Sequence, residues 1–304
     1  MVAMEKKIYA YHEALHAWYK KHARDLPWRN TTDPYKILIS EVMLQQTQVE
    51  RVLPKYEAFL EAFPTVKHLA QASNADLLRL WSGLGYNSRA LRLKAAAEEV
   101  CTIYGGIFPK DRALLQNMKG IGAYTSGAIM AFAYHASVSF SDTNIKRLVH
   151  RVFVGLELQG WKKSEKEIAA LVEEVCDYPH AYEYHQALMD LGATVCRATK
   201  MSCTICPMKA LCNAHKEIIE NPLLLEEKRV SYKKSTVPFK ESKRYIRGGI
   251  VEYLRQAHTV VPLSVLITFV QEQLRTMPAE DILSIVQDLE KEGLIVREEG
   301  GLRL

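Results

Sequence analysis

Apolar residues recur three or four positions apart along most of the chain, which is the spacing of a helix with one buried face. Segments that alternate β-branched with polar residues, which would predict strands, are few before the last thirty residues. The body of the chain is therefore predicted to be all-α. Helices are expected at residues 9–21, 37–56, 66–73, 75–81, 88–104, 125–134, 144–153, 164–175 and 181–193.

The helical spacing stops after residue 213. Charged residues and two isolated prolines, Pro222 and Pro238, replace it. Such a composition is typical of a connection between domains. Residues 214–243 are therefore predicted to be a linker.

A small second domain is predicted over residues 244–304. Three helices and a terminal hairpin are expected there, at residues 245–257, 262–274, 278–292, 294–297 and 302–304. This order of elements resembles a winged-helix domain. The third helix carries five acidic residues, namely Glu280, Asp281, Asp288, Glu290 and Glu292. Because these carboxylates would repel phosphates, packing or contact with a protein partner is expected there in preference to DNA reading.

The composition, with 48% hydrophobic and 25% charged residues, is ordinary for a globular protein. No apolar run approaches the length of a membrane span. No apolar stretch of signal-peptide type follows the lysines among the first seven residues. We therefore expect a cytoplasmic protein with no membrane partner.

The formal charge of +5 is unevenly spread. Residues 241–304 carry eight Lys or Arg and ten Asp or Glu, so the preceding 240 residues carry 32 against 25, a net +7. This basic body favours a polyanionic partner, although the excess alone is a weak argument.

Cys196, Cys203, Cys206 and Cys212 are separated by six, two and five residues. A run this compact can place four thiolates around one small inorganic centre, so the sequence predicts either a [4Fe–4S] cluster or a structural zinc ion. The spacing favours the cluster. Disulfides are not expected, because the chain shows no sign of secretion.

A glycine-rich turn lies between two predicted helices, where Gly120, Ile121 and Gly122 follow Lys119. Such a turn lets backbone N–H groups at a helix N-terminus face a phosphate without obstruction by side chains. A connection that merely needs glycines is the alternative. Asp142 follows Gly122 by twenty residues.

The turn, this aspartate and the four-cysteine loop together resemble the helix-hairpin-helix DNA glycosylases of the endonuclease III superfamily, over about residues 8–213. The resemblance implies two helical lobes with the substrate cleft between them. A six-helix barrel that includes the hairpin is expected over residues 30–136. An iron–sulfur cluster lobe is expected over residues 1–29 and 137–213.

Further motifs are similar to the MutY-type adenine glycosylase branch of that superfamily. The block from Glu41 to Val49 discriminates best between branches. The other similar motifs are Leu26-Pro27-Trp28-Arg29, Asp33-Pro34-Tyr35-Lys36, Trp81-Ser82-Gly83-Leu84-Gly85-Tyr86 and Met189-Asp190-Leu191-Gly192-Ala193.

Cleavage of the bond between adenine and deoxyribose needs two carboxyl groups in different states. One donates a proton to the departing purine, and the other stays ionised beside the developing oxocarbenium ion. The resemblance implies that Glu41 is the proton donor and that Asp142 stabilises the cation, with Asn144 beside it in the catalytic site. A solvated carboxylate is the alternative for Glu41, and a plain helix cap is the alternative for Asp142.

Tyr124 stands at the position that indicates whether the enzyme cleaves the DNA strand after it removes the base. In related glycosylases that also cleave the strand, the matching position holds a lysine that forms a Schiff base with the sugar. A tyrosine there implies a monofunctional enzyme without efficient AP lyase activity.

The target base must leave the stack before a catalytic group can reach it. The resemblance implies that Gln186 faces the flipped base, and that Trp28 and Arg29 line the base pocket. Tyr86 and Gln46 would fill the opened duplex. A surface charge is the alternative for Arg29, and a core aromatic for Tyr86. The other residues expected to touch DNA are Gln45, Thr47, Lys119, Gly120, Ile121, Gly122, Ala123 and Thr125.

Three positions depart from the branch. Asn87, Thr143 and His185 stand where tyrosine, glycine and asparagine are usual. Full-length members also carry a Nudix-like C-terminal domain that senses 8-oxoguanine, and residues 241–304 are too short for it. Recognition of 8-oxoguanine is therefore left open.

The leading hypothesis is a monomeric, nucleoid-associated DNA glycosylase of base excision repair. It would bind double-stranded DNA and remove adenine mispaired with guanine or 8-oxoguanine. A glycosylase of the same superfamily acting on thymine, uracil or hypoxanthine is one alternative. A non-catalytic iron–sulfur protein that binds DNA is the other.

Overall fold

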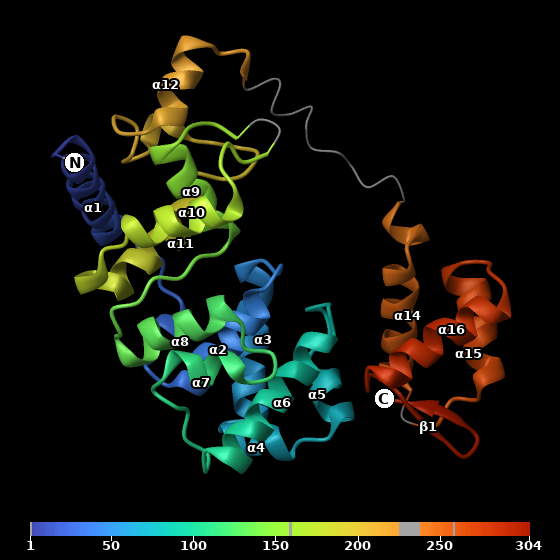
Figure 1. The fold of residues 1–304 in the computed structure, drawn as a ribbon. Helices are drawn as coiled ribbons and strands as arrows, with labels where there is room; N and C mark the ends of the chain where they lie inside the picture. Colours follow the sequence, from blue (N-terminus) through green and yellow to red (C-terminus); the bar gives the residue numbers. More distant parts are fainter. Residues whose placement is uncertain (1, 158–159, 225–237, 258) are drawn as a thin grey trace. The chain divides into compact units, whose positions relative to one another are not determined.

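The structure is a computed structural model that describes residues 2–157, 160–224, 238–257 and 259–304. The described residues are mainly helical, as the apolar spacing predicts (Figure 1). Contacts group the chain into two compact units. The first comprises Met1–Pro34, Lys110–Arg112 and Gly122–Lys234, and the second comprises Tyr35–Pro109, Ala113–Ile121 and Ser235–Leu304.

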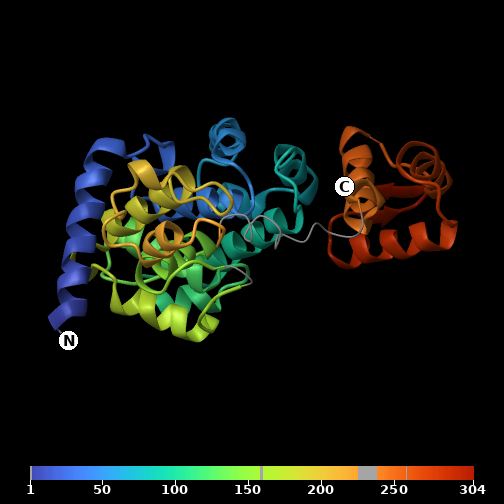
Figure 2. The ribbon, with the colours of Figure 1, turned by 90° about the horizontal axis from the view of Figure 1, so that it is seen from above.

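The first unit is built around α9 and α11. Helix α1 packs along α11, and α9 contacts α10, α11 and α12 (Figures 1 and 2). The helices are α1 (Val2–His22), α8 (Ala123–Tyr134), α9 (Thr143–Phe153), α10 (Glu165–Glu174), α11 (Ala181–Thr194) and α12 (Asn213–Glu220). Short 3₁₀ turns are η1 (Pro27–Arg29), η2 (Tyr178–His180) and η3 (Cys203–Ile205).

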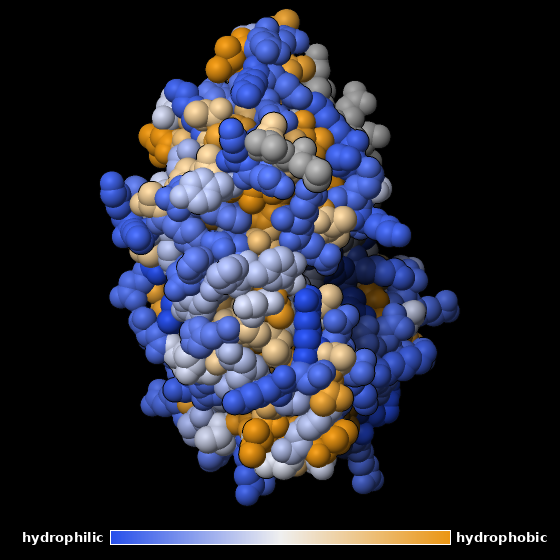
Figure 3. All heavy atoms as spheres, turned by 60° about the vertical axis from the view of Figure 1, so that its left-hand side comes forward, coloured by the Kyte–Doolittle hydropathy of each residue, from blue (hydrophilic) through white to orange (hydrophobic). Residues whose placement is uncertain are grey.

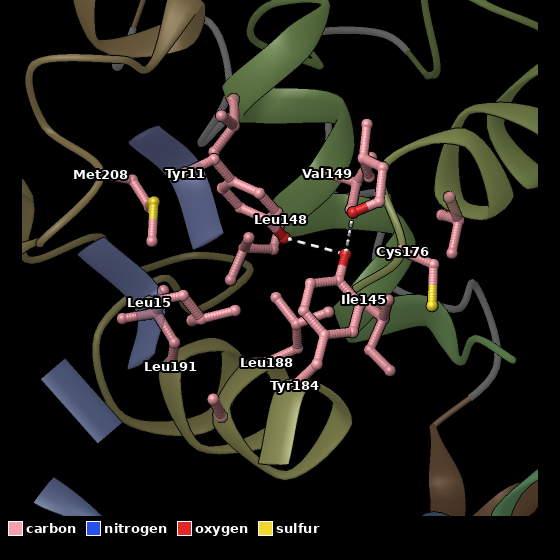
Figure 4. Close-up of a cluster of buried hydrophobic side chains, with 14 of the residues drawn as sticks. Tyr11, Leu15, Ile145, Leu148, Val149, Cys176, Tyr184, Leu188, Leu191 and Met208 are labelled. Atoms are coloured by element: carbon pink, nitrogen blue, oxygen red, sulfur yellow. Dashed lines mark hydrogen bonds between the residues drawn. The ribbon is translucent and has the colours of Figure 1, made fainter. Parts of the chain in front are cut away.

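Tyr11 and Tyr184 lie in the core of this unit (Figure 4). Their hydroxyl oxygens are 3.3 Å apart, and the Tyr184 hydroxyl donates to the carbonyl oxygen of Val175 at 3.0 Å. Each polar end therefore has a partner inside an apolar cluster. Met208, from the four-cysteine loop, is also buried in this cluster, so the loop is anchored to the core that α1, α9 and α11 share.

The second unit contains the other helices of the body and the C-terminal residues. Helix α4 packs on α6, and α5 contacts α3 and α6. The helices are α2 (Pro34–Leu44), α3 (Val49–Ala62), α4 (Val66–Gln71), α5 (Asn74–Leu80), α6 (Ser88–Ile103) and α7 (Arg112–Asn117). The C-terminal elements are η4 (Phe239–Glu241), α14 (Lys243–Gln256), α15 (Leu263–Phe269) with the π-helical turn η5 (Val270–Leu274), α16 (Ala279–Lys291), β1 (Val296–Glu298) and β2 (Gly301–Arg303).

One predicted helix is wrong. Residues 37–56 form two helices, because α2 ends at Leu44 and α3 begins at Val49. Gln46 between them has a φ of +56°, a left-handed conformation that no continuous α-helix contains. The spacing of apolar residues does not predict this break, since the apolar residues on both sides of it keep the same helical period.

The predicted linker over residues 214–243 is also partly wrong, because it begins with helix α12. The Asn213 amide donates to the carbonyl oxygen of Phe153 at 2.9 Å and accepts from Lys7 at 3.0 Å. Glu217 accepts from the backbone N–H of Leu156 at 2.8 Å. These polar contacts hold α12 against the end of α9. The spacing of apolar residues cannot predict them, so the helix was missed. Residues 225–237 of the predicted linker lie outside the described residues.

The three helices and the hairpin predicted for the C-terminal domain are present, and β1 pairs antiparallel with β2. A Cβ at Gly301 would lie 2.0 Å from the carbonyl oxygen of Val261, so only glycine fits there. Two of the acids expected on the face of the third helix have partners within the domain, because Glu290 pairs with Arg297 and Glu292 with Arg247. The likeness to a winged helix and the role of this domain stay predictions.

Helix α8 was expected in the barrel lobe, whereas its contacts group it with the first unit. The ring of Phe132 packs edge-on against Phe140 and Tyr182, with centroids 5.5 Å away in both cases. The aromatic side chains thus join α8 to residues that follow it.

Among the described residues, no helix combines the length and the apolar character needed to cross a membrane. The face drawn in Figure 3 is mostly hydrophilic, and its hydrophobic residues occur in small separate groups.

Candidate functional site

Glu41 is buried near the C-terminal end of α2, with 6% of its surface exposed. The neighbouring Ile39, Val42 and Met43 are buried as well. A solvated surface carboxylate, the alternative considered for Glu41, is therefore wrong. A carboxyl group that is withdrawn from solvent is the kind of group that proton-transfer sites use.

Arg89 organises the turn that follows α2. It is 5% exposed, and its Nη1 donates to the carbonyl oxygens of Val42, Met43 and Gln45 at 2.7, 3.0 and 2.6 Å. A cation at these carbonyls suits the C-terminal end of a helix. Burial lowers the pKa of Arg89 to about 10.

The same guanidinium also holds a second turn. Its Nη2 donates to the Thr47 hydroxyl at 3.2 Å and to the carbonyl oxygens of Leu84 and Gly85 at 2.9 and 3.0 Å. Arg89 therefore joins the Gln45–Thr47 turn to the turn before Tyr86, two segments that the sequence assigned to DNA contact. Sequence reasoning missed Arg89.

We expect Arg89→Lys to destabilise the protein by on the order of 3 kcal/mol, because a lysine ammonium cannot replace a planar guanidinium that spans two turns. Urea unfolding of the variant measures this loss. Arg92→Lys, on the exposed side of the same helix, serves as the matched control and should change stability little. Equal unfolding midpoints for the two variants would contradict the role given to Arg89.

Tyr86 is 43% exposed and has a φ of +48°. The alternative of a core aromatic beside Trp81 is therefore wrong; Trp81 is buried and its indole N–H donates to the carbonyl oxygen of Gly85 at 3.1 Å. Arg244 of α14 donates to the Tyr86 hydroxyl at 3.0 Å. Exposure of the ring is compatible with contact to DNA, which stays a prediction.

The glycine-rich turn has the backbone that the sequence predicts. Gly120 has a φ of +82°, and a Cβ there would lie 2.8 Å from the Cβ of Arg92. Lys119, Gly122 and Ala123 are exposed, and Gly122 is the N-cap of α8.

Ile121 and Thr125 are buried, with 3% of each residue exposed, so their side chains are not available for the predicted contact with DNA. Ile121 belongs to the hydrophobic core and Thr125 is a buried polar residue. Backbone N–H groups at the start of a helix are in general suited to a phosphate.

Asp142 is the N-cap of α9, where its Oδ1 accepts from the backbone N–H of Ile145 at 2.8 Å. Asn144 donates to the other carboxylate oxygen at 2.6 Å. Arg147 in turn donates to the Asn144 side-chain oxygen at 3.0 Å and to the carbonyl oxygen of Cys196 at 3.0 Å. Capping is therefore confirmed, and hydrogen bonds link Asp142 to the start of the four-cysteine loop.

None of the four cysteines of this loop forms a disulfide bond in the described chain. Arg151, which is 1% exposed, donates to the Cys196 sulfur at 3.3 Å and to the carbonyl oxygens of Arg197 and Ala198. The Cys212 thiol donates to the carbonyl oxygen of Arg151 at 3.2 Å. Arg151 therefore fixes both ends of the loop.

The spacing of the sulfurs bears on which centre they suit. Within the described part of the chain, no three of the four sulfurs lie within 4.8 Å of one another. A tetrahedral zinc ion with Zn–S bonds of about 2.3 Å needs sulfurs about 3.8 Å apart. The sulfurs therefore stand wider apart than a single zinc ion needs, and four thiols are also the donor set of a [4Fe–4S] cluster.

Gln186 on α11 and Trp28 in η1 are buried, with 4% and 6% exposed. Arg29 is not the surface charge considered as its alternative, because it forms two hydrogen bonds to Asp190 at 2.7 and 2.8 Å. Asp190 is fully buried and joins η1 to α11. Whether these residues line a base pocket stays a prediction.

Tyr124, on the first turn of α8, is half-buried, and its ring packs edge-on against Phe140 with the ring centroids 5.4 Å apart.

The predicted site residues are divided between the two units. The first unit holds Trp28, Arg29, Tyr124, Asp142, Asn144, Gln186 and the four cysteines. The second unit holds Glu41, Gln45, Gln46, Thr47, Tyr86, Lys119, Gly120 and Ile121.

His185 is fully buried and stacks on Phe140 at 4.0 Å. Its Nδ1 lies 2.7 Å from the carbonyl oxygen of Ala181, and its Nε2 accepts from the backbone N–H of Phe140 at 3.2 Å. These bonds suit a neutral ring that donates through Nδ1. Burial lowers the pKa of His185 to about 4.

Stability should therefore fall in acid because of this residue. The unfolded ring binds a proton near pH 6.5, whereas the folded ring resists protonation to about pH 4, so the contribution is present above pH 6.5 and is lost as the pH falls toward 4. Between pH 7 and pH 5 the free energy of unfolding of the unaltered protein should fall by about 2 kcal/mol more than that of the His185→Asn variant. Urea unfolding at the two pH values measures both losses. Parallel losses in the two proteins would contradict the buried neutral ring.

Comparison with known proteins defines the class. The family model of the HhH-GPD superfamily base excision DNA repair proteins matches residues 39–176. A solved thermostable thymine-DNA glycosylase is similar with a TM-score of 0.65 and 28% identity, over 71% of this chain and 99% of that one. A non-covalent endonuclease III–DNA complex has the same fold, with a TM-score of 0.59 and 19% identity over 69% of this chain and 95% of that one. Residues 39–176 are therefore an HhH-GPD domain.

Within this superfamily, similar curated proteins are adenine DNA glycosylases. The chain is 36% identical over 210 residues to that of Buchnera aphidicola (from Acyrthosiphon pisum), 42% over 194 residues to that of Mycolicibacterium smegmatis, and 35% over 228 residues to the human protein. These matches cover 69%, 63% and 72% of this chain. The chain spans 60%, 65% and 42% of the lengths of the three relatives.

Proposed function

We propose that this protein is a DNA glycosylase of base excision repair that hydrolyses the N-glycosidic bond of adenine mispaired with guanine or 8-oxoguanine. The observation that carries the proposal is the burial of Glu41 in α2. The adenine glycosylases named above are 35–42% identical to this chain, which supports adenine as the base.

In this proposal Glu41 donates a proton to the departing adenine. Asp142 remains ionised and stabilises the positive charge that develops on the sugar. Asn144 holds the Asp142 carboxylate by its hydrogen bond at 2.6 Å, and Arg147 holds Asn144. Fixed hydrogen bonds of this kind keep a charged group oriented before the reaction begins.

Tyr124 supports base removal without strand cleavage. A tyrosine has no amine to form a Schiff base with the sugar, so the abasic strand would remain intact. The flipped adenine would be read by Gln186, whose amide can form two hydrogen bonds with an adenine edge.

The four cysteines would hold a [4Fe–4S] cluster. The sulfur spacing and the four-thiol donor set support it over a single zinc ion. When bound, the cluster would fold the loop of residues 196–212 and would take no part in the chemistry. The loop would in turn support Arg147, which donates to the carbonyl oxygen of Cys196.

Double-stranded DNA would be bound through backbone N–H groups at the start of α8 and through the two turns that Arg89 joins. Exposed Gln46 and Tyr86 would enter the space left by the flipped base.

A thymine glycosylase is the second candidate, because the similar thermostable structure acts, by its name, on thymine. Duplexes with adenine, thymine, uracil or hypoxanthine opposite guanine and opposite 8-oxoguanine distinguish the two candidates when the released base is identified by chromatography. We expect free adenine, with strand scission only after alkali. Thymine as the main product would favour the second candidate, and scission without alkali would contradict the role of Tyr124.

A further inference from the structure

Two imidazoles and a carboxylate converge in the first unit on a place that the proposed function does not use. His16 lies on α1, Asp177 follows α10, and His180 lies in η2. His16 Nε2 is 2.7 Å from Asp177 Oδ2, and His180 Nδ1 is 3.1 Å from the same oxygen. One ligand atom from each residue lies within 4.8 Å of the other two.

Both imidazoles hydrogen-bond to Asp177, and no helix cap competes for the side chains of Asp177 and His180. Within residues 160–224 of the described chain, Asp177 makes no side-chain cap to η2 and His180 makes none to α11, although both stand at N-cap positions. Asp177 is 9% exposed, so its carboxylate needs a positive partner close by. A metal ion supplies that charge as well as a protonated imidazole does.

We propose that His16, Asp177 and His180 bind one zinc-class divalent ion that fastens α1 to the segment leading into α11. Two imidazole nitrogens and one carboxylate oxygen are typical zinc ligands. Tetrahedral bonds of about 2.0–2.1 Å need ligand atoms about 3.3 Å apart. The 3.1 Å separation at His180 is close to this value, and the 2.7 Å hydrogen bond at His16 would lengthen when the ion takes the place of its proton. His180 is exposed, so the ion can enter from solvent and keep a water molecule as its fourth ligand.

The site would act on stability and not on the chemistry of base removal. Helix α1 contributes Tyr11 and Leu15 to the core of the first unit, and a metal ligand at the residue that follows Leu15 would hold that helix in place. A ligand that binds only the folded chain raises the temperature of unfolding.

The test uses the full chain with iron in its cysteine loop, stripped of loosely bound metal with EDTA and then dialysed against Zn²⁺. Zinc and iron are counted per chain by mass spectrometry, and thermal unfolding is followed with and without zinc. We expect one zinc per chain in addition to the iron, with a higher unfolding temperature. His16→Ala/His180→Ala should lose both effects. His22→Ala, an exposed histidine on the same helix, should keep both.

The single variant His180→Ala keeps the test valid if the double variant fails to fold, because the His180 side chain is exposed and lies outside the core. It should lower zinc affinity at least tenfold without changing the unfolding temperature in EDTA. X-ray absorption at the zinc edge should show nitrogen and oxygen neighbours without sulfur. No zinc uptake, uptake retained in the double variant, or sulfur neighbours that place the ion among the cysteines would each overturn the proposal.

Discussion

Replacing Glu41 with glutamine should slow adenine release by at least about 100-fold under single-turnover conditions, since a positioned general acid contributes roughly that much or more. Glutamine has nearly the same size as glutamate, so α2 should keep its packing. It has no carboxyl proton to give to the departing purine. Binding of a mismatched duplex should be retained, which separates a loss of chemistry from a loss of affinity.

Glu50→Gln on α3 is the matched control for Glu41→Gln, because Glu50 is exposed. Its rate should stay within about twofold of the unaltered protein, as expected for a surface substitution. If Glu41→Gln releases adenine as fast as this control does, the proton donor has been assigned to the wrong residue.

The second large effect is on stability. Asp190→Ala should lower the free energy of unfolding by about 3–5 kcal/mol, because it leaves buried positive charge without its partner. The Asp190 carboxylate accepts from the Arg24 backbone N–H and Nε at 3.1 and 2.6 Å and from both terminal nitrogens of Arg29. Burial raises the pKa of Asp190, but these bonds and charges outweigh it and hold the pKa below the usual value.

Urea unfolding measures this loss, and Asp76→Ala is its control. Asp76 pairs with Arg79 at the surface, so that variant should lose no more than about 1 kcal/mol. Arg29→Met combined with Asp190→Leu should recover much of the stability, because an apolar pair can replace a buried ion pair. A small loss in Asp190→Ala would show that this pair does not hold η1 to α11.

Sequence reasoning predicted the helices well where one face is apolar over several turns, as in α6 and α11. It merged α2 and α3, because the break at Gln46 depends on a left-handed backbone and on Arg89, which lies more than forty residues away along the chain. No local pattern reports such a bond. The same limit explains α12, whose first residue, Asn213, binds residues of α1 and α9.

Sequence reasoning predicted the two carboxylates of the candidate site but not the residues that support them. Motif resemblance led to Glu41 and Asp142, and the structure adds the burial of the first and the capping bonds of the second. The residues that support them were missed, namely Arg89, Arg147 and Arg151. Arg147 and Arg151 stand one turn apart in α9 among buried apolar residues. That position is the signal that marks them, because a buried guanidinium must find several carbonyl partners.

The central claim is that this chain removes adenine in preference to other mispaired bases. A competition experiment tests it most directly, with one duplex that carries an adenine opposite 8-oxoguanine and a thymine opposite guanine, incubated with excess protein. Free adenine should appear first and in one equivalent, with thymine retained in the strand. Release of thymine before adenine, or of neither base from a duplex that the protein binds, would contradict the account.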